Sequence, residues 1–524
     1  SGSAIVGGIT TNTSGTSNFR AGVNAGNSIT SGGNYNTVVG DEAGTAITTG
    51  DLNTFLGYNA GATTATASDN TGVGYNAGAS ITTGVQNVLI GGLAGDALVD
   101  AHFNTAVGYG ALTTDTESNY NTAIGYLALT TANNTSSTNG YNVAVGARAG
   151  ASITTGVQNV LIGGLAGDAI NSASNNTALG YSSLTANTTG INNVGIGSGA
   201  LFTNTTAANN TAVGTNSLLL NTTGANNTAV GFLSLDANDT GGSNVAVGFS
   251  ALGANTTAAY NTAVGNAALA INTTGTQNVA VGAFALDANT TANDNTAVGY
   301  AALTTNTTGA SNTAVGRNAL GLNLTADYNT AVGYQALTAN TTGYSNTAVG
   351  VDASRSNTDG FRNTALGQLA LQTTTTGDGN IAIGYNAIST SATANGQCTL
   401  GSSLITNLRC NDTTISSISD SRDKTNIIDS PYGLDFINTV RPVQFKWETR
   451  DGNAKDGSTR IGFLAQELLA ATDGNNAVLD LVLDDNPERL EAKYGNLLPI
   501  LVKAIQEQNA LIEALTTRIT TLEG

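Results

Sequence analysis

Few residues in this chain have types and spacing that could do chemistry. Ser419 opens the stretch SDSRDKTNI, which places a hydroxyl five residues before Lys424. A serine attacks a carbonyl carbon when a neighbouring base takes its proton, and a lysine can be that base once it is uncharged. The same residues also fit an ordinary polar turn before a strand. Their spacing alone does not decide between these two interpretations.

The remaining reactive side chains predict no second site. Cys398 and Cys410 are too few for a disulfide scaffold, and with a single His they make a zinc site implausible. We interpret both cysteines as structural or free thiols, and His102 as a satisfied side chain at the surface or between layers. No metal site and no cofactor are predicted.

Composition restricts the class of protein. Only 10% of the 524 residues are charged, whereas about a quarter is usual. The formal charge of −18 argues against nucleic acid as a partner, because phosphate is bound by clustered Lys and Arg. No apolar run approaches the roughly 20 residues of a membrane-spanning helix, so membrane insertion is not predicted.

The start of the chain carries neither an initiator Met nor the basic segment of a signal peptide. We therefore expect a fragment or processed product that lacks an N-terminal attachment domain.

Most of the chain is a repeat with a fixed period. The pattern N-x-x-x-G begins at Asn36 and recurs every 17 residues to Asn380, with a single step of 21 after Asn121. Degenerate end copies begin at Asn18 and Gln397. A fixed period of this length predicts a solenoid, in which each unit is stable only when stacked on its neighbours.

The typical unit reads N-T-A-V-G-Y-x-A-L-T-x-N-T-T-G-x-x. Short β-branched runs between Gly and Asn-Thr-Thr-Gly predict two short strands and two turns in each coil. Position 5 is always Gly, which indicates a backbone conformation or close approach that a Cβ would block. Position 8 is always Ala or Ser, which indicates tight packing between layers or chains.

The Asn-Thr-Thr stretches are also glycosylation sequons. We interpret them as turns in which Asn adopts the left-handed conformation. Acidic residues in the array are scattered and do not follow the period, so a glycosidase carboxylate pair is only a minor alternative.

These N-T-A-V-G and N-V-A-V-G units resemble the S-V-A-I-G repeats in the heads of trimeric autotransporter adhesins, over roughly residues 15–405. The resemblance implies a trimeric stacked β-roll or related β-solenoid. Periodicity alone predicts neither the trimer nor the handedness.

The composition changes near residue 418. All four prolines, the single Trp and every Lys lie beyond it. Residues 443–447 (VQFKW) alternate apolar and polar as a half-buried strand does. A heptad pattern then predicts a terminal coiled coil, with a positions Leu498, Ile505, Ile512 and Ile519 and d positions Leu501, Gln508, Leu515 and Leu522. Ile at a with Leu at d favours two strands, so this pattern does not itself predict three.

Three ordered motifs in residues 419–524 resemble the C-terminal intramolecular chaperone of endosialidase-type tailspikes, phage fibres and neck appendages. They are S-D-x-R-x-K, Y-G-L-D-F-I followed by P-V-x-F-K-W, and G-x-x-A-Q-E. The fold class predicted for the whole chain is therefore mainly β: a trimeric solenoid with 17-residue coils, then a small α+β chaperone domain that ends in a coiled coil.

The resemblance also implies residue roles. Members of the family cut the chain directly before the motif serine, which places the bond between Ile418 and Ser419. Ser419 would be the nucleophile and Lys424 the general base, while Asp420 and Arg422 would hold the local geometry. Self-cleavage is the only catalysis predicted, with no activity on an external substrate.

The predicted domains follow from these boundaries. They are a lead-in with a degenerate repeat at 1–35, the repeat shaft at 36–401, a neck and cleavage linker at 402–418, and the chaperone at 419–524, with its coiled coil at about 497–524.

The predicted function is a homotrimeric segment of a phage tail fibre or tailspike, located in the virion, for attachment to a host surface. Its expected partners are a host cell-surface glycan or protein receptor and, through an absent N-terminal part, the phage tail or baseplate. A bacterial cell-surface trimeric adhesin or filament is the main alternative, and a polysaccharide-degrading enzyme is a weaker one.

Overall fold

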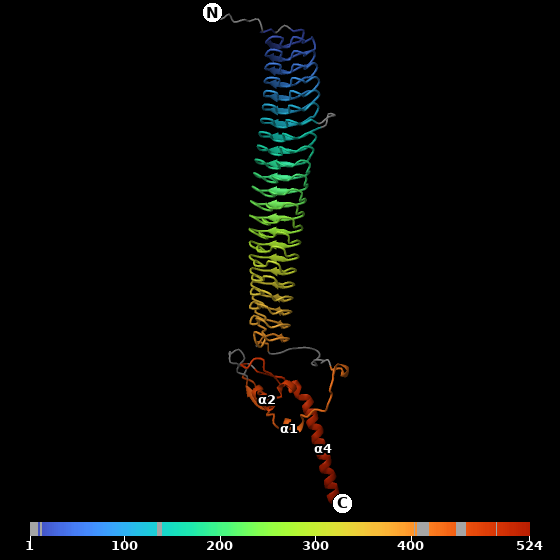
Figure 1. The fold of residues 1–524 in the computed structure, drawn as a ribbon, viewed down its shortest axis with the longest axis vertical. Helices are drawn as coiled ribbons and strands as arrows, with labels where there is room; N and C mark the ends of the chain where they lie inside the picture. The colour runs from blue at the N-terminus through green and yellow to red at the C-terminus, as the bar shows by residue number, and fades with distance from the viewer. Residues whose placement is uncertain are drawn as a thin grey trace. The chain divides into compact units, whose positions relative to one another are not determined.

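The structure of the chain is a computed structural model, and it forms two compact units, Ser1–Thr342 and Gly343–Gly524 (Figure 1). The described residues are 9–10, 13–133, 139–402, 404–405, 419–446, 457–488 and 490–524.

The first unit is a column of stacked coils, each of which contributes one short strand (Figure 1). The strands are β1 (Ile9–Thr10), β2 (Phe19–Ala21), β3 (Thr37–Val39), β4 (Thr54–Leu56), β5 (Thr71–Val73), β6 (Val88–Ile90), β7 (Thr105–Val107), β8 (Thr122–Ile124), β9 (Val143–Val145), β10 (Val160–Ile162), β11 (Thr177–Leu179), β12 (Val194–Ile196), β13 (Thr211–Val213), β14 (Thr228–Val230), β15 (Val245–Val247), β16 (Thr262–Val264), β17 (Val279–Val281), β18 (Thr296–Val298), β19 (Thr313–Val315) and β20 (Thr330–Val332).

From β2 onward the strands of this unit pair in parallel and in register. In β13 and β14, for example, Ala212 lies opposite Ala229 and Val213 opposite Val230. Positions in a repeat are counted from the Asn that opens it. The strand residue at position 3 points into the coil and is buried, while those at positions 2 and 4 face outward. The predicted β-solenoid with 17-residue coils is confirmed.

The prediction of two strands per coil is wrong. The rest of each coil is a series of turns, because three residues per coil adopt the left-handed conformation, as Asn216, Leu218 and Asn226 do with φ of 56°, 50° and 62°. Such residues cannot lie in an extended strand. The backbone on this side still bonds from coil to coil, as in the 3.0 Å hydrogen bond from the Leu218 amide to the Ser234 carbonyl.

The Gly at position 5 forms a column of close backbone contacts. Gly231 has a φ of +136°, and a Cβ placed on it would lie 2.4 Å from the carbonyl oxygen of Gly248 in the next coil. Both reasons inferred from the sequence, the backbone conformation and the close approach, are confirmed. The small residue at position 8 is also explained, because residues such as Ala229 at position 3 and Ala251 at position 8 are fully buried inside the coils.

The Asn at position 1 is buried and links successive coils through its side chain. The Asn227 amide nitrogen donates to Asn210 Oδ1 at 2.9 Å, and Asn227 Nδ2 donates to the Gly241 carbonyl at 2.8 Å. Each side chain therefore bonds both the backbone of the coil after it and the far side of its own coil.

A second column of buried amides runs through position 12, the Asn of Asn-Thr-Thr. Asn221 Nδ2 donates to Asn204 Oδ1 at 2.9 Å and to the Gly224 carbonyl at 3.0 Å. These Asn residues are not left-handed, so the conformation expected for them is wrong, although their structural role in the turn is confirmed. Because they are buried, they are not accessible to a glycosyl carrier.

In most coils a large aliphatic side chain reaches the interior from position 9 or from position 12. Most coils with Leu at position 9, such as Leu218, carry Asn at position 12. All but one of the coils with Gly at position 9 carry an aliphatic side chain at position 12 instead, and a Cβ on Gly78 would lie 2.9 Å from Ile81 Cδ1. In the exception, which has Thr64 at position 12, Phe55 fills the space beside Gly61. The two positions therefore fill the same space from opposite sides.

The second unit contains the remaining coils and the C-terminal segment (Figure 1). Its elements are β21 (Thr347–Val349), β22 (Thr364–Leu366), β23 (Ile381–Ile383), β24 (Cys398–Leu400), the 3₁₀ turn η1 (Ser421–Asp423), α1 (Leu434–Ile437), β25 (Val443–Lys446), β26 (Thr459–Gly462), α2 (Ala465–Ala471), α3 (Asn476–Leu479), β27 (Val482–Leu483), β28 (Glu491–Ala492), η2 (Tyr494–Asn496) and α4 (Leu497–Glu523).

The C-terminal segment has its own small core. Leu468 on α2, Leu481 and Val482 at β27, and Leu497 and Ile500 on α4 are all buried in it. The α+β class and the long terminal helix are confirmed. β25 alternates in burial along its length as predicted, and it pairs with β26 as an antiparallel hairpin. Trp447 and most of the predicted linker at 402–418 lie outside the described residues.

We predict that two adjacent glycines differ sharply in their tolerance of a side chain. Gly163 has a φ of +139° and would place a Cβ 2.4 Å from the Gly180 carbonyl oxygen, whereas a Cβ on Gly164 meets only Tyr181 at 3.6 Å. Gly163→Ala should lower stability by about 2 kcal/mol or more, through strain and overpacking. Gly164→Ala should change it little. Equal thermal unfolding midpoints for the two variants would contradict this packing.

We further predict a pH-dependent defect at Asp115, which occupies position 12 where most coils with Leu at position 9 carry Asn. Its buried carboxylate accepts hydrogen bonds from the Ser118 amide, at 3.0 Å, and from the Ser118 hydroxyl, and burial raises its pKa from 3.8 to about 6. Because the folded pKa lies above the unfolded one, the folded state loses stability as pH rises from about 4 to about 6. At higher pH the loss is constant, on the order of 3 kcal/mol.

Asp115→Asn restores the usual residue and removes this charge. The variant should therefore unfold at a higher temperature than wild type at pH 7, and the two should converge at pH 4. A difference in melting temperature that is the same at pH 4 and pH 7 would show that ionisation of Asp115 is not its cause.

Candidate cleavage site

The side chains of Ser419 and Lys424 meet in the structure. Lys424 Nζ donates a hydrogen bond of 2.5 Å to Ser419 Oγ. The short 3₁₀ turn η1 lies between them and reverses the chain, so two residues five apart in sequence face each other. The turn therefore brings together Ser419 and Lys424, whose role the sequence spacing alone did not decide.

Asp420 and Arg422 hold this turn. The Asp420 carboxylate caps η1 by accepting a 2.9 Å hydrogen bond from the Arg422 amide, and the Arg422 guanidinium pairs with the same carboxylate at 2.5 Å. Hydrogen bonding to the Arg422 side chain, and then to its backbone, lowers the pKa of Asp420. The position of these two residues is consistent with the supporting role predicted for them.

The chemistry open to this pair depends on its surroundings. Ser419 and Lys424 are both exposed to solvent in the single chain. A lysine takes up a proton from serine only when it is uncharged, and removal from water favours that form. Ile418, on the other side of the predicted bond, lies outside the described residues, so its carbonyl is not placed relative to Ser419 Oγ.

The other motifs of the segment fix its helices to one another. Gly433 has no side chain because Glu507 of α4 occupies that space: a Cβ on Gly433 would lie 2.3 Å from Glu507 Oε2. That oxygen accepts a 2.7 Å hydrogen bond from the Leu434 amide at the start of α1. Arg441 forms an ion pair with Glu467 of the A-Q-E motif, and this contact lowers the pKa of Glu467.

The roles of Glu507 and Glu467 are not visible in the sequence. Glu507 lies in the terminal heptad pattern, which predicted a partner helix for its neighbours and nothing for Glu507 itself. The A-Q-E motif marked Glu467 as characteristic without indicating its partner. No local signal in the sequence links either residue to a segment tens of positions away.

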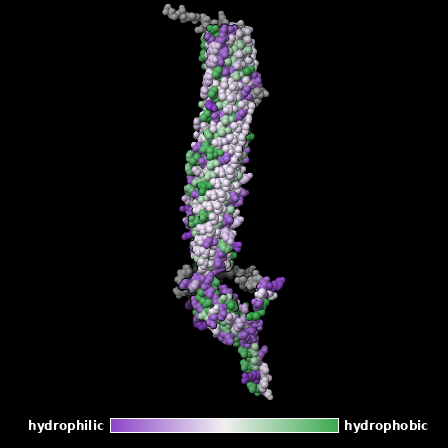
Figure 2. Space-filling model, viewed as in Figure 1, coloured by the Kyte–Doolittle hydropathy of each residue, from purple (hydrophilic) through white to green (hydrophobic). Residues whose placement is uncertain are grey.

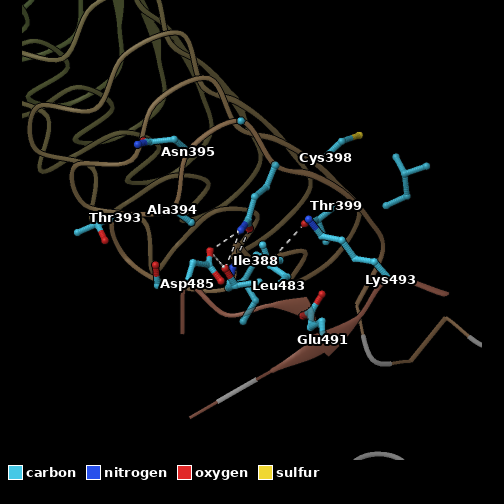
Figure 3. Close-up of a pocket in the computed structure, with 15 residues that line it drawn as sticks. Ile388, Thr393, Ala394, Asn395, Cys398, Thr399, Leu483, Asp485, Glu491 and Lys493 are labelled. Carbon is cyan, nitrogen blue, oxygen red and sulfur yellow. Dashed lines mark hydrogen bonds between the residues drawn. The ribbon is translucent and has the colours of Figure 1, made fainter. Parts of the chain in front are cut away.

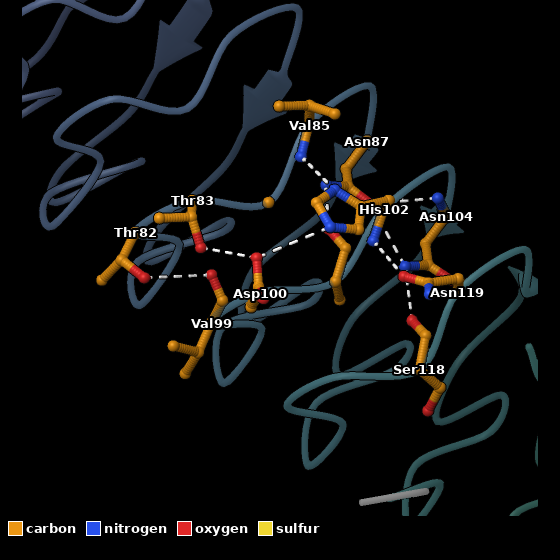
Figure 4. A network of polar contacts seen from close by, with 12 residues as sticks. Thr82, Thr83, Val85, Asn87, Val99, Asp100, His102, Asn104, Ser118 and Asn119 are labelled. Atoms are coloured by element: carbon orange, nitrogen blue, oxygen red, sulfur yellow. Dashed lines mark hydrogen bonds and ion pairs between the residues drawn. The ribbon is translucent and has the colours of Figure 1, made fainter. Parts of the chain in front are cut away.

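His102 is a satisfied side chain between coils, as predicted (Figure 4). Its Nδ1 accepts a 3.0 Å hydrogen bond from the Val85 amide, and its own amide donates to Asn119 Oδ1 at 2.7 Å. Asp100 lies 3.5 Å from its Nε2. Other coils use Asp, Asn or Ser at this position for the same bond, as Asp378 does in accepting from the Phe361 amide.

Cys398 carries a free, exposed thiol, while Cys410 lies outside the described residues. Within the described ranges no three His, Cys, Asp or Glu side chains gather as metal ligands would. Over the same ranges no helix is both long enough and apolar enough to cross a membrane.

These observations define a class of protein in which stacked β-solenoid coils are followed in sequence by a small α+β segment that begins at a Ser–Lys pair. Comparison with known protein families agrees with this class. Residues 419–479 match the Peptidase_S74 family, described as the chaperone of endosialidase. No curated protein matches the chain.

Proposed function

We propose that the chain is a homotrimeric segment of a phage tail fibre or tailspike, folded by a C-terminal intramolecular chaperone. The observation that carries the proposal is the family match at residues 419–479, which directly follows a β-solenoid in the sequence. We propose the same domain division as the sequence predicts: a lead-in at 1–35, a shaft at 36–401, a linker at 402–418 and a chaperone at 419–524. Host attachment in the virion is part of this proposal.

The outer face of the strands supports association of several chains. Position 4 is Val, Ile or Leu in every full repeat, yet these side chains face outward, and Leu179 and Ile90 are 44% and 39% exposed. Neither position 2 nor position 4 carries a charge in any of these repeats. Hydrophobic side chains form patches on the surface of the stacked coils (Figure 2). A long apolar surface of this kind marks an interface.

The terminal helix supports the same conclusion. Leu497, Ile500 and Ala504 of α4 pack on the segment's own core, whereas the predicted a and d positions face solvent. Ile505, for example, is 56% exposed. This helix therefore presents one apolar face to its own chain and a second to other copies. A coiled coil at the end of the chain would raise the effective concentration of the partner chains and set their stagger.

The Ser–Lys pair supports autocleavage between Ile418 and Ser419. In this proposal Ser419 Oγ attacks the carbonyl carbon of Ile418, and Lys424 takes the serine proton and returns it to the departing amine of Ser419. An ester between Ser419 and Ile418 follows and water hydrolyses it. Because both side chains are exposed in one chain, cover by the partner chains would supply the desolvation that an uncharged lysine requires.

We predict that the intact protein is an elongated trimer in analytical ultracentrifugation, held in part by the outer strand face. The double variant Val264→Asp and Val298→Asp places charges on that face, so it should dissociate or unfold at a clearly lower temperature. The control Thr257→Asp and Thr291→Asp adds the same charges to exposed turns and should behave as wild type. A wild-type monomer at micromolar concentration, or equal behaviour of the two double variants, would reject this interface.

We also predict self-cleavage that yields a fragment beginning Ser-Asp-Ser-Arg, detected by intact-mass spectrometry. Ser419→Ala should leave full-length trimers, because folding precedes cutting. Lys424→Ala should slow cleavage by roughly 100-fold or more, the usual contribution of a general base.

Lys424→Arg is the matched control for the role of the lysine. Arginine keeps the charge and the hydrogen bond to Ser419 but cannot lose its proton in a protein, so this variant should also stay uncut. Rapid cutting of Lys424→Arg would show that the lysine only positions Ser419. Wild-type trimers that remain whole for days would remove the cleavage assignment.

A further inference from the structure

The last coil of the solenoid differs from the others in ways that the sequence repeat does not explain. Its position 9 is Ile388, which does not adopt the left-handed conformation found at Leu218 and its equivalents. A β-branched side chain disfavours that conformation. The following Asn position is taken by Gln397, which has a longer side chain.

This longer side chain bonds back to the coil before it. In regular coils, backbone amides on this side donate to the next coil. In the last coil the Thr390 amide donates instead to Gln397 Oε1 at 2.9 Å, and Gln397 Nε2 donates to Thr390 Oγ1 at 2.7 Å. Gln397 therefore satisfies a group that a further regular coil would otherwise bond.

The rest of this cluster comes from the C-terminal segment. Asp485 Oδ2 accepts hydrogen bonds from Thr390 Oγ1 at 2.6 Å and from Gln397 Nε2 at 2.9 Å. Asn486 Nδ2 donates to the Thr390 carbonyl at 2.6 Å. The amide, hydroxyl and carbonyl of Thr390 are thus all bonded, and two of the three bonds involve residues about 95 positions away in sequence. Figure 3 shows Asp485 beside the last coil, with dashed lines for hydrogen bonds next to it.

Asp485 and Asn486 are presented by a fixed turn. Asn486 Oδ1 accepts a 3.1 Å hydrogen bond from the Glu488 amide, which closes the turn on itself. The turn follows directly after β27, where Leu481 and Val482 are buried in the core of the C-terminal segment. A cleft of about 780 Å³ lies between the antiparallel hairpin β27–β28 and the last coil. The two surfaces therefore meet through a few directed polar contacts and not through a packed apolar interface.

We propose that the Asp485–Asn486 turn is a docking element that caps the last coil, and that Thr390 and Gln397 are the residues it binds. The Asp485 carboxylate is a charged acceptor for two neutral donors, the Thr390 hydroxyl and the Gln397 amide. Such hydrogen bonds are stronger than those between two neutral groups. An uncapped coil end leaves backbone groups unpaired, and it offers an edge for wrong pairing. Holding this coil in place gives the coils before it a formed template to stack on. This inference rests on the proposed chaperone function and names the site through which it acts.

The test uses the full chain with Ser419→Ala, which keeps the two segments joined. Hydrogen–deuterium exchange of peptides covering residues 386–400 is compared with and without Asp485→Ala. Exchange there should become roughly ten-fold faster or more, the effect of losing a bond to a charged group, while peptides from the first unit stay unchanged. Asp429→Ala removes an exposed carboxylate from the same segment and is the matched control. Unchanged exchange at 386–400 in the Asp485→Ala protein would overturn the proposal.

Thr390→Val tests the same contact from the solenoid side, and it leaves the C-terminal segment intact if Asp485→Ala prevents folding. It should speed exchange at 386–400, and no change there would again overturn the proposal. A chain without residues 419–524 separates this result from the wider function. If that chain folds normally while Asp485→Ala speeds exchange, the docking contact stands and the chaperone role fails. If it aggregates while both variants exchange as the parent does, the chaperone role stands and the docking site fails.

Discussion

The column of buried Asn amides is the interaction on which the rest of the solenoid depends. Each side chain accepts from the Asn backbone of the next coil and donates across its own coil, so both halves of a coil are fixed to one axis. A buried amide is costly unless its bonds are complete, and only a neighbour at the same register completes them. The 21-residue coil obeys this constraint, because the Asn142 amide still donates to Asn121 Oδ1 at 3.1 Å.

The amide columns leave a narrow interior, and this explains the composition of the repeat. Small side chains fill position 8 in every coil and position 3 in most coils, and in most coils an aliphatic group comes from position 9 or position 12. Asp115 breaks the pattern by placing an ionisable group where an amide or aliphatic chain belongs. The remaining apolar residues have no place inside, so Val, Ile and Leu at position 4 lie on the outer face. One chain alone cannot bury them.

In the C-terminal segment, by contrast, single contacts between residues that are distant in sequence fix the fold. Glu507 holds the start of α1, and Arg441, two residues before β25, pairs with Glu467 of α2. Asp485 connects the segment to the last coil. Each of these contacts uses a charged side chain. The repeat needs almost no charge, because its neighbours are always copies of itself.

The sequence by itself determined the solenoid, its period, the need for Gly at position 5, and the long terminal helix. These features are set by local conformation and by repetition, which a sequence displays directly. The family resemblance at residues 419–524 indicated Ser419 and Lys424, but only the folded turn brought Lys424 Nζ to Ser419 Oγ. The tertiary structure alone decided that Asn lies inside, that the second side of each coil is turn and not strand, and that Asp485 meets Thr390. These features depend on which polar groups lose contact with water when the coils stack. The sequence of a single repeat does not show this.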